Sequence, residues 1–237
     1  MKSAQHLRLM TYNVHRCVGS DRERDLGRVL DVIAAGNADI LGLQEVETPL
    51  HRAGDDFLRG LEALGYAVLP GPTLRDRRGG YGNALALRGG WDDLRRLDLS
   101  VPGREPRGAL SVRSELVPGG LQVITTHLGL HVRERWCQAQ RLCRYLMTVA
   151  AGPRLLLGDL NDWACGTPTL WPLRRRFSQH RGVRSYPAVR ALWRLDRIWF
   201  GGAGTLHAAA EVPEPGPARG SDHRAVSACL ELPLRSH

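Results

Sequence analysis

Short apolar runs, several with alternating apolar and polar residues, divide the chain into segments of strand length. Residues 6–14 alternate most clearly. The segments 109–117 and 121–127 are separated by Pro118-Gly119-Gly120, a turn signal that predicts a hairpin. The predicted strands span residues 6–14, 39–43, 66–69, 83–87, 109–117, 121–127, 154–157, 195–200 and 226–232.

Apolar residues recur at helical spacing in three further segments, which predicts helices over residues 25–35, 55–64 and 133–150. Gly36-Asn37 and Gly65 follow the first two segments and supply a helix stop.

Strands outnumber helices in this pattern, and hairpin-length loops join many of them. Two packed mixed sheets flanked by helices fit this order better than a doubly wound parallel sheet, so we predict an α/β (α+β) fold. The polar stretch 71–82 predicts a loop, and the proline-rich residues 213–217 are too few for a domain linker. There is no internal repeat, and we predict a single domain over residues 1–237.

The composition is globular and strongly basic. Of 237 residues, 43% are hydrophobic and 24% are charged, which is enough for one large domain or two small ones. The net charge of +9 favours nucleic acid or anionic lipid as a partner. Every basic residue except Lys2 is arginine, so compositional bias is the alternative to a functional basic patch.

Five cysteines occur without a CxxC pair, which argues against a zinc ribbon and predicts buried, reduced thiols. No apolar stretch approaches the length of a membrane-spanning helix, and the N-terminal residues contain no long apolar signal region. We therefore expect a soluble, cytoplasmic protein.

Acidic, amide and imidazole side chains stand where predicted strands begin or end. Hard oxygen ligands together with two histidines suit a divalent metal and the hydrolysis of phosphate esters. The residues at these positions are Glu45, His127, Asp159, Asn161, Asp222 and His223.

Seven short motifs in one order resemble the endonuclease/exonuclease/phosphatase family, which includes exonuclease III, pancreatic-type deoxyribonuclease and neutral sphingomyelinase. The resemblance runs from about residue 8 to about residue 232. It implies a four-layer αββα sandwich, an active site at one edge of the paired sheets, and Mg²⁺ as cofactor with Mn²⁺ as a possible substitute. The motifs are Met10-Thr11-Tyr12-Asn13-Val14, Leu43-Gln44-Glu45-Val46, Gly82-Asn83-Ala84-Leu85, Thr126-His127-Leu128, Gly158-Asp159-Leu160-Asn161, Leu195-Asp196-Arg197-Ile198 and Ser221-Asp222-His223.

The resemblance implies a metal site formed by Glu45, Asn13 and Asp222. Glu45 matches the principal Mg²⁺ ligand of the family, and a single strong acid suffices because Mg²⁺ keeps several waters. The alternatives are a solvated acid at a strand end for Glu45 and a turn cap for Asn13.

The same resemblance implies a catalytic group of five residues. Asp159 matches the residue that orients and deprotonates the attacking water, although with Asn161 it could instead form an Asx turn. His223 matches the residue that stabilises charge on the phosphate, held by Asp196, and His127 matches a second phosphate-facing histidine. Which histidine is the acid stays open.

Four further residues are candidates for substrate binding. Arg107 lies in a matching segment and could grip a phosphate oxygen, or could be an ordinary loop arginine. His15 stands where DNA-repair members carry an acid; it is a poor ligand for a hard metal and could contact phosphate or simply face solvent. Asn83 belongs to the third motif, and Arg78 to a basic loop with one aromatic residue, Tyr81.

Substrate choice depends on the loops, and the loops here are basic and aromatic. Residues 174–177 add a second basic patch, and Trp163, Trp171 and Trp193 flank the later motifs. Arginine and aromatic side chains together suit single strands or DNA phosphates. We therefore predict a monomeric metal-dependent phosphodiesterase acting on nucleic acid. The alternatives are a phospholipid or other small phosphodiester hydrolase with peripheral contact to an anionic membrane, and a catalytically inactive binding module.

Overall fold

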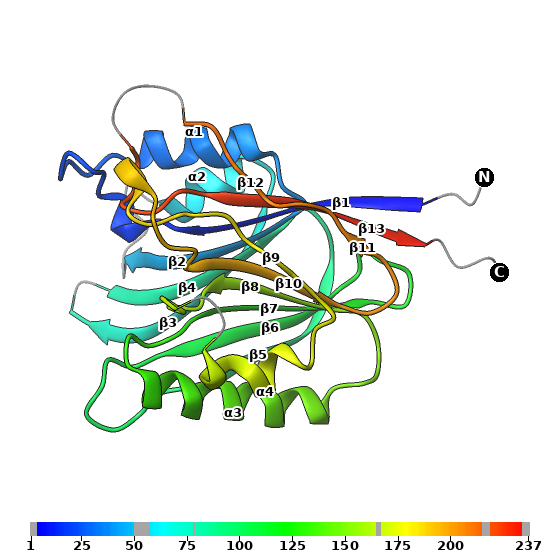
Figure 1. The fold of residues 1–237 in the computed structure, drawn as a ribbon. Coiled ribbons are helices and arrows are strands. Elements are labelled where there is room, and N and C mark those ends of the chain that lie inside the picture. The colour runs from blue at the N-terminus through cyan, green and yellow to red at the C-terminus, as the bar shows by residue number, and fades with distance from the viewer. Residues whose placement is uncertain (1–3, 50–56, 78, 165–166, 215–218, 234–237) are drawn as a thin grey trace.

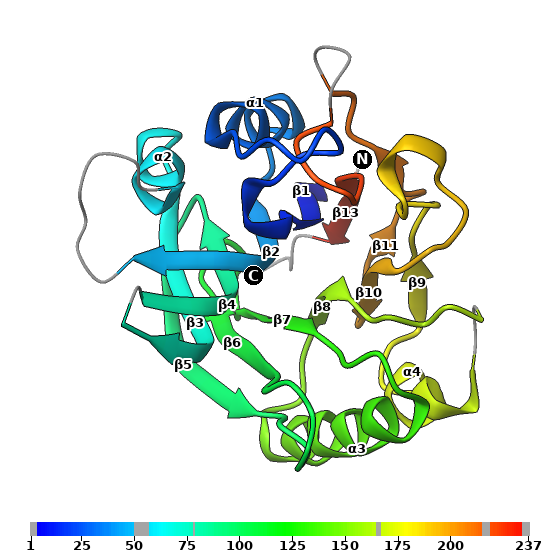
Figure 2. The same ribbon diagram turned by 90° about the vertical axis from the view of Figure 1, so that its left-hand side faces the viewer.

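The computed structural model describes residues 4–49, 57–77, 79–164, 167–214 and 219–233. Two β-sheets pack face to face between two layers of helices (Figure 1). One sheet is covered by α1 (Leu26–Gly36) and α2 (Phe57–Ala63), and the other by α3 (Val132–Thr148) and α4 (Trp171–Arg174). The view from one end shows the four layers in the order helix, sheet, sheet, helix (Figure 2), which confirms the predicted αββα sandwich.

In the first sheet, the described strands run in the order β11-β13-β1-β2-β4-β3, and β12 pairs with β13. β1 is parallel to β2 and antiparallel to β13, so the sheet is mixed. Its strands are β1 (Ala4–Asn13), β2 (Ile40–Pro49), β3 (Ala67–Asp76), β4 (Gly79–Leu87), β11 (Thr205–Leu206), β12 (Ala210–Glu211) and β13 (Val226–Pro233).

The second sheet has the order β5-β6-β7-β8-β10-β9 among the described residues, with β7 parallel to β8 and the other neighbours antiparallel. β6 and β7 form the predicted hairpin. The strands are β5 (Trp91–Asp98), β6 (Gly108–Ser114), β7 (Leu121–His127), β8 (Arg154–Asp159), β9 (Gln179–Arg181) and β10 (Asp196–Gly201). Three short 3₁₀ turns complete the described elements: η1 (His15–Cys17), η2 (Pro168–Leu170) and η3 (Ala188–Arg190).

Alternation along each strand separates the apolar core into three layers, because successive side chains point to opposite faces of a sheet. On β1, Leu7 and Leu9 pack between the two sheets, whereas Met10 and Tyr12 pack beneath α1 and α2. A third cluster, which includes Trp199 of β10, lies beneath α3 and α4.

Two sequence predictions about this fold are wrong. Residues 71–76 and 79–82 form the ends of the β3–β4 ribbon and not a loop, because their mostly half-exposed side chains give no core alternation. The strand predicted over 39–43 continues to Pro49 in β2, with a bulge between Leu43 and Val46.

Short or exposed elements carry too little apolar periodicity to be found in the sequence. β5 is absent from the predicted strands, since it is an edge strand with mostly exposed polar side chains. The short strands β9, β11 and β12 and the four-residue α4 are likewise absent from the predicted elements.

Two expectations from composition have a structural counterpart. No helix in the described ranges is both long and apolar enough to cross a membrane. The four described cysteines form no disulfide with one another: Cys17 and Cys143 are buried as expected, whereas Cys137 and Cys229 are partly exposed.

Candidate active site

The strand register of the second sheet brings three predicted site residues side by side. Asp159 ends β8 and lies directly opposite His127 of β7 on one side and Asp196 of β10 on the other. Directly opposed residues in a β-ladder present their side chains on the same face. All three side chains are buried, with at most 6% of each residue exposed.

The first sheet contributes Asn13 from the end of β1 and Glu45 from the bulge inside the neighbouring parallel strand β2. Asn13 pairs with Gln44 in the register of β1 and β2, and the Gln44 side chain points between the sheets, where its Nε2 donates to Thr125 Oγ1 at 3.2 Å. In a regular strand Glu45 would then point to the opposite face. The bulge and the positive φ of 59° at Glu45 redirect its side chain toward Asn13.

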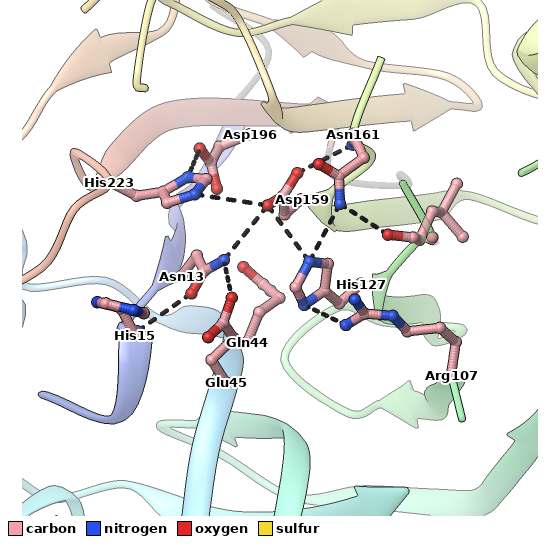
Figure 3. Close-up of polar contacts among 12 residues, drawn as sticks. Asn13, His15, Gln44, Glu45, Arg107, His127, Asp159, Asn161, Asp196 and His223 are labelled. Carbon is pink, nitrogen blue, oxygen red and sulfur yellow. Dashed lines mark hydrogen bonds and ion pairs between the residues drawn. The ribbon is translucent and has the colours of Figure 1, made fainter. Parts of the chain in front are cut away.

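Asp159 lies at the centre of the resulting cluster (Figure 3). Its Oδ1 accepts a hydrogen bond from the backbone N–H of Asn161 at 2.9 Å, which is the Asx-type contact expected for this spacing. Its Oδ2 lies 3.3 Å from Asn13 Nδ2, 3.5 Å from His127 Nε2 and 3.7 Å from His223 Nε2. Groups from both sheets therefore converge on one carboxylate oxygen.

His223 is held as a cation between two carboxylates. Its Nδ1 lies 2.8 Å from Asp196 Oδ2, as predicted. Burial lowers the pKa of His223, but the charges of Asp196, Asp159 and Asp222 outweigh burial and raise the pKa to about 10. At neutral pH the ring therefore carries a proton on each nitrogen, and its Nε2–H faces Asp159.

His127 is in the opposite protonation state. Burial, reinforced by the charge of Arg107, lowers the pKa of His127 to about 4, although Asp159 acts against this. Arg107 Nη1 lies 2.9 Å from His127 Nδ1, and a guanidinium only donates, so Nδ1 accepts. The single proton of the neutral ring is then on Nε2, the nitrogen that faces Asp159.

Asn161 has a fixed orientation beside this histidine. Its Nδ2 donates to the carbonyl oxygen of Leu128 at 2.8 Å and lies 3.2 Å from His127 Nε2. The residue is 1% exposed and adopts a left-handed φ of 49°, a conformation that asparagine tolerates better than most residues.

Glu45 is oriented by two hydrogen bonds, one to each oxygen. Asn13 Nδ2 donates to Oε1 at 2.9 Å, and the Tyr81 hydroxyl donates to Oε2 at 2.7 Å. Burial raises the pKa of Glu45, but these two hydrogen bonds favour its charged form, and the pKa lies below its usual value. The carboxylate is therefore ionised and preorganised at neutral pH.

Asp222 is the third residue of the predicted metal site. Burial raises its pKa, and the charge of Glu45 raises it further, which shows that the two carboxylates repel one another. Magnesium is bound in proteins by one or two carboxylates and keeps several waters. Glu45 and Asp222, with Asn13 beside them, thus fit a divalent cation.

A second set of ligand atoms also lies close together. One ligand atom each of Asp159, Asp196 and His223 lies within 4.8 Å of the others. A histidine that is protonated on both nitrogens has no lone pair for a metal, and its Nδ1 is already bonded to Asp196. This group therefore fits the movement of protons better than the binding of a metal.

The predicted substrate-binding residues are dispersed. His15 lies near the cluster: its N–H donates to Asn13 Oδ1 at 3.1 Å, and its Nδ1 is 3.6 Å from Asp222 Oδ1. Asn83 is buried, and its Nδ2 donates to the carbonyl oxygen of Gly108 at 2.8 Å, so this amide joins the two sheets. Arg78 lies outside the described residues.

The start of α3 supports the loop that follows His127. Gln138 Oε1 accepts from the Gly129 N–H at 2.8 Å, and Arg135 Nη1 donates to the Gly129 carbonyl at 3.1 Å. Glu134 accepts from the backbone N–H of His131 and completes a capping box at the helix start.

Three residues of the site are not singled out by the sequence. Tyr81 contacts Glu45 from β4, within the segment predicted to be a loop. Ser221 Oγ donates to the Asn13 carbonyl at 2.7 Å and so attaches the loop of His223 to β1. Tyr186 packs its ring 4.8 Å from that of His223. The Ser-Asp-His motif could have indicated Ser221. No local sequence pattern indicates that Tyr81 contacts Glu45 or that Tyr186 contacts His223.

The fold and the site define a protein of the phosphoesterase class. Over residues 10–223 the chain matches the Endonuclease/Exonuclease/phosphatase family, and it belongs to that family. The members are hydrolases of phosphoester bonds and generally depend on a divalent metal. The resemblance inferred from the seven motifs is thereby confirmed.

Individual relatives agree with this assignment over almost the whole chain. The uncharacterized protein YbhP of Escherichia coli K12 is 30% identical over 254 residues, which cover 95% of this chain and 96% of YbhP. An endonuclease/exonuclease/phosphatase from Beutenbergia cavernae superposes with a TM-score of 0.77 at 22% identity, covering 97% of this chain and 72% of that one. Mannosyl-6-phosphatase Bt3783 of Bacteroides thetaiotaomicron superposes with a TM-score of 0.72 at 18% identity, covering 94% of this chain and 99% of that one. At these identities the two structures support the fold alone.

Proposed function

We propose that this chain is a divalent-metal-dependent phosphodiesterase that acts on nucleic acid, and that Asp159 activates the attacking water. The observation that carries the proposal is the convergence of Asn13, His127 and His223 on Asp159 Oδ2, at 3.3, 3.5 and 3.7 Å. A general base must lie within hydrogen-bond reach of the water from which it takes the proton. Asp159 meets this requirement for a water among these donors, and Asn161 holds the other oxygen of the carboxylate.

The two histidines have different tasks because their charges differ. Protonated His223 supplies a positive charge and an N–H where negative charge develops on the phosphate, and Asp196 holds its ring in place. Neutral His127 presents an N–H to the same point without adding charge. His223 is therefore the histidine that can release a proton to the leaving oxygen and regain it from solvent.

A divalent metal, when bound by Glu45 and Asp222, supplies Lewis-acid polarisation of a phosphate oxygen. Asn13 Nδ2 donates to both Glu45 and Asp159 and so fixes the two carboxylates relative to one another. Tyr81 fixes the orientation of Glu45 from the other side. The intact set of carboxylates, amides and imidazoles argues against the binding-module alternative, since a surface that only binds has no need of it.

A substrate panel tests the proposal. Purified protein is incubated with single-stranded DNA, plasmid DNA, RNA, bis(p-nitrophenyl) phosphate, mixed phospholipids and a sugar monophosphate, each with Mg²⁺, Mn²⁺ or EDTA. We expect cleavage of nucleic acid and of the small diester with metal, none with EDTA, and none by Glu45→Ala.

Other outcomes distinguish the alternatives. Turnover of lipid with inert nucleic acid would establish the phospholipid hydrolase. Turnover of the sugar monophosphate alone would establish a phosphatase, the activity named for the Bacteroides thetaiotaomicron protein. Absence of hydrolysis under every condition would leave the inactive binding module.

A further inference from the structure

A basic cavity lies at the edge of the second sheet, and some of its lining residues are adjacent in sequence to the catalytic residues. It has a volume of about 590 Å³, and Trp199 of β10 forms part of its wall. Asp162 of its lining follows Asn161, and Arg197 follows Asp196. Since successive strand residues point to opposite faces, Arg197 faces away from His223, on the side where Trp199 packs. The charged and titratable lining residues are Asp162, Arg174, His180, Arg181, Arg194 and Arg197.

The lining has a large excess of positive charge. Among the described lining residues there are four arginines and one acid. Arg181 donates to the backbone carbonyls of His207 and His180, and it forms no ion pair with a carboxylate among the residues that the structure describes. Burial lowers the pKa of His180, and the charges of Arg174, Arg181 and Arg197 lower it further. The positive potential of these three guanidinium groups therefore adds up at the His180 ring. Such a cavity attracts an anion.

Aromatic rings connect this cavity with the active site. Trp163 follows Asp162 and Trp193 precedes Arg194, and their ring centroids are 5.2 Å apart. Trp163 also contacts Tyr186 at 5.6 Å, and Tyr186 lies 4.8 Å from the His223 ring. The two tryptophans are 36% and 37% exposed, so their rings remain accessible to a ligand. A row of rings therefore leads from the catalytic histidine to Trp163 and Trp193, the sequence neighbours of the lining residues Asp162 and Arg194.

We propose that this cavity is a second phosphate-binding site, which holds a backbone phosphate of a single-stranded nucleic acid whose bases stack on Trp163 and Trp193. The proposal rests on the proposed function in one respect, because the scissile phosphate of the same strand is taken to lie at Asp159. Alternating cations and aromatic rings are the means by which proteins bind single strands without sequence preference. Arginine suits such a site because its planar group pairs with two phosphate oxygens at once.

A charge-matched pair of variants tests the cavity. The double variant Arg174→Ala/Arg194→Ala removes two cations from the lining. Arg59→Ala/Arg144→Ala removes two exposed cations from α2 and α3 and gives the same net charge. Binding of a fluorescein-labelled oligothymidylate is measured by anisotropy in EDTA at several salt concentrations, after circular dichroism and thermal melting have shown that all three proteins are folded.

We expect the cavity variant to bind about tenfold more weakly and the control to bind like the wild type. The slope of log affinity against log salt is expected to fall by about 0.7 for each phosphate that the variant no longer neutralises. Equal weakening in both variants would mean that total charge alone drives binding, and no weakening in either would mean that the strand lies elsewhere; both results overturn the proposal. Binding that depends on Arg174 and Arg194 but occurs only on anionic phospholipid vesicles overturns it as well, in favour of a membrane surface.

The failure of this proposal can be told apart from that of the proposed catalysis. Bis(p-nitrophenyl) phosphate has one phosphate, so its hydrolysis by the wild type reports on the Asp159 site alone. Hydrolysis of this diester without oligonucleotide binding rejects the second site and retains the phosphodiesterase. Oligonucleotide binding through the cavity without diester hydrolysis rejects the phosphodiesterase and retains the second site.

Discussion

Individual side chains in this site owe their properties to one or two neighbours. His127 and His223 both face Asp159 Oδ2, yet the pKa of one is about 4 and that of the other about 10. The difference arises from the group on the far nitrogen, which is the Arg107 guanidinium for His127 and the Asp196 carboxylate for His223. Two residues of the same type thus serve as a neutral donor and as a cation.

Removing the guanidinium should raise the pKa of His127. Arg107 lowers this pKa by its positive charge, so we expect the value in Arg107→Gln to lie clearly above 4 while burial keeps it below the usual 6.5. The pKa of His127 is measured in the wild type and in Arg107→Gln by following the histidine ring signals in an NMR pH titration. Asp196→Asn serves as the comparison, in which the pKa of His223 should fall from about 10. An unchanged His127 pKa in Arg107→Gln would show that the guanidinium does not control the ring.

The hydroxyl of Tyr81 should strengthen metal binding through Glu45. Tyr81→Phe removes one hydrogen bond from Glu45 and keeps the ring on which the Arg16 guanidinium stacks at 4.4 Å. We expect Mn²⁺ affinity to fall by about 10- to 100-fold, as is typical when a group that orients a ligand is removed. Isothermal titration calorimetry gives this value directly. Wild-type affinity in Tyr81→Phe would mean that Glu45 is oriented without it.

The sequence predicted the identity of the clustered residues better than their interactions. Glu45, Asp159 and His223 could be found because each stands in a motif whose order along the chain resembles the family. The contact of Arg107 with His127 and that of Tyr81 with Glu45 cross between strands, so no local pattern encodes them. The protonation state of each histidine depends on contacts of this kind, so it cannot be predicted from the sequence.

Among the strands, the register around β8 determines the site. His127, Asp159 and Asp196 lie side by side because β7 and β8 end where the antiparallel strand β10 begins. Three of the acids and histidines predicted at strand ends are thus adjacent in the sheet. The extent of β2 was mispredicted because the bulge at Glu45 allows the strand to continue past the site, and a bulge has no apolar signature.

The close approach of β7 and β8 beside the site requires glycine at position 158. Gly158 has a φ of 152°, and a Cβ there would lie 2.0 Å from the Thr126 carbonyl oxygen. We expect Gly158→Ala to lower the free energy of unfolding by about 1–3 kcal/mol, because the two strands must separate locally. Urea denaturation measures the change. Gly152→Ala is the control, since a Cβ at Gly152 has nothing within 4 Å, and equal stability of both variants would refute the argument.

For the molecule as a whole, a buried acid next to the catalytic loop should make stability depend on pH. Glu214 Oε2 accepts from the Gly220 N–H at 2.9 Å, and burial raises the pKa of Glu214 above its usual value. The folded state then holds this proton more tightly than the unfolded state. Stability is lost as the pH rises from the ordinary glutamate pKa, near 4.3, through the raised value of the folded protein.

Glu214→Gln should remove this loss, since glutamine carries no charge and can still accept from Gly220. We expect the variant to be more stable than the wild type at pH 7 and equally stable below about pH 4. Thermal melts across this range measure the difference. If Glu214→Gln were more stable than the wild type by the same amount at every pH, the difference would come from packing and not from the ionisation of Glu214.

Hydrolysis of bis(p-nitrophenyl) phosphate by the wild type and by Asp159→Asn, each with Mg²⁺ and with EDTA, is the most direct test of the account. Asparagine preserves the shape of the side chain and cannot take a proton from water. We predict metal-dependent turnover by the wild type and a loss of about 10²- to 10⁴-fold in Asp159→Asn, with Mg²⁺ binding and folding retained. Near-wild-type turnover in Asp159→Asn would contradict the assignment of Asp159 as the base.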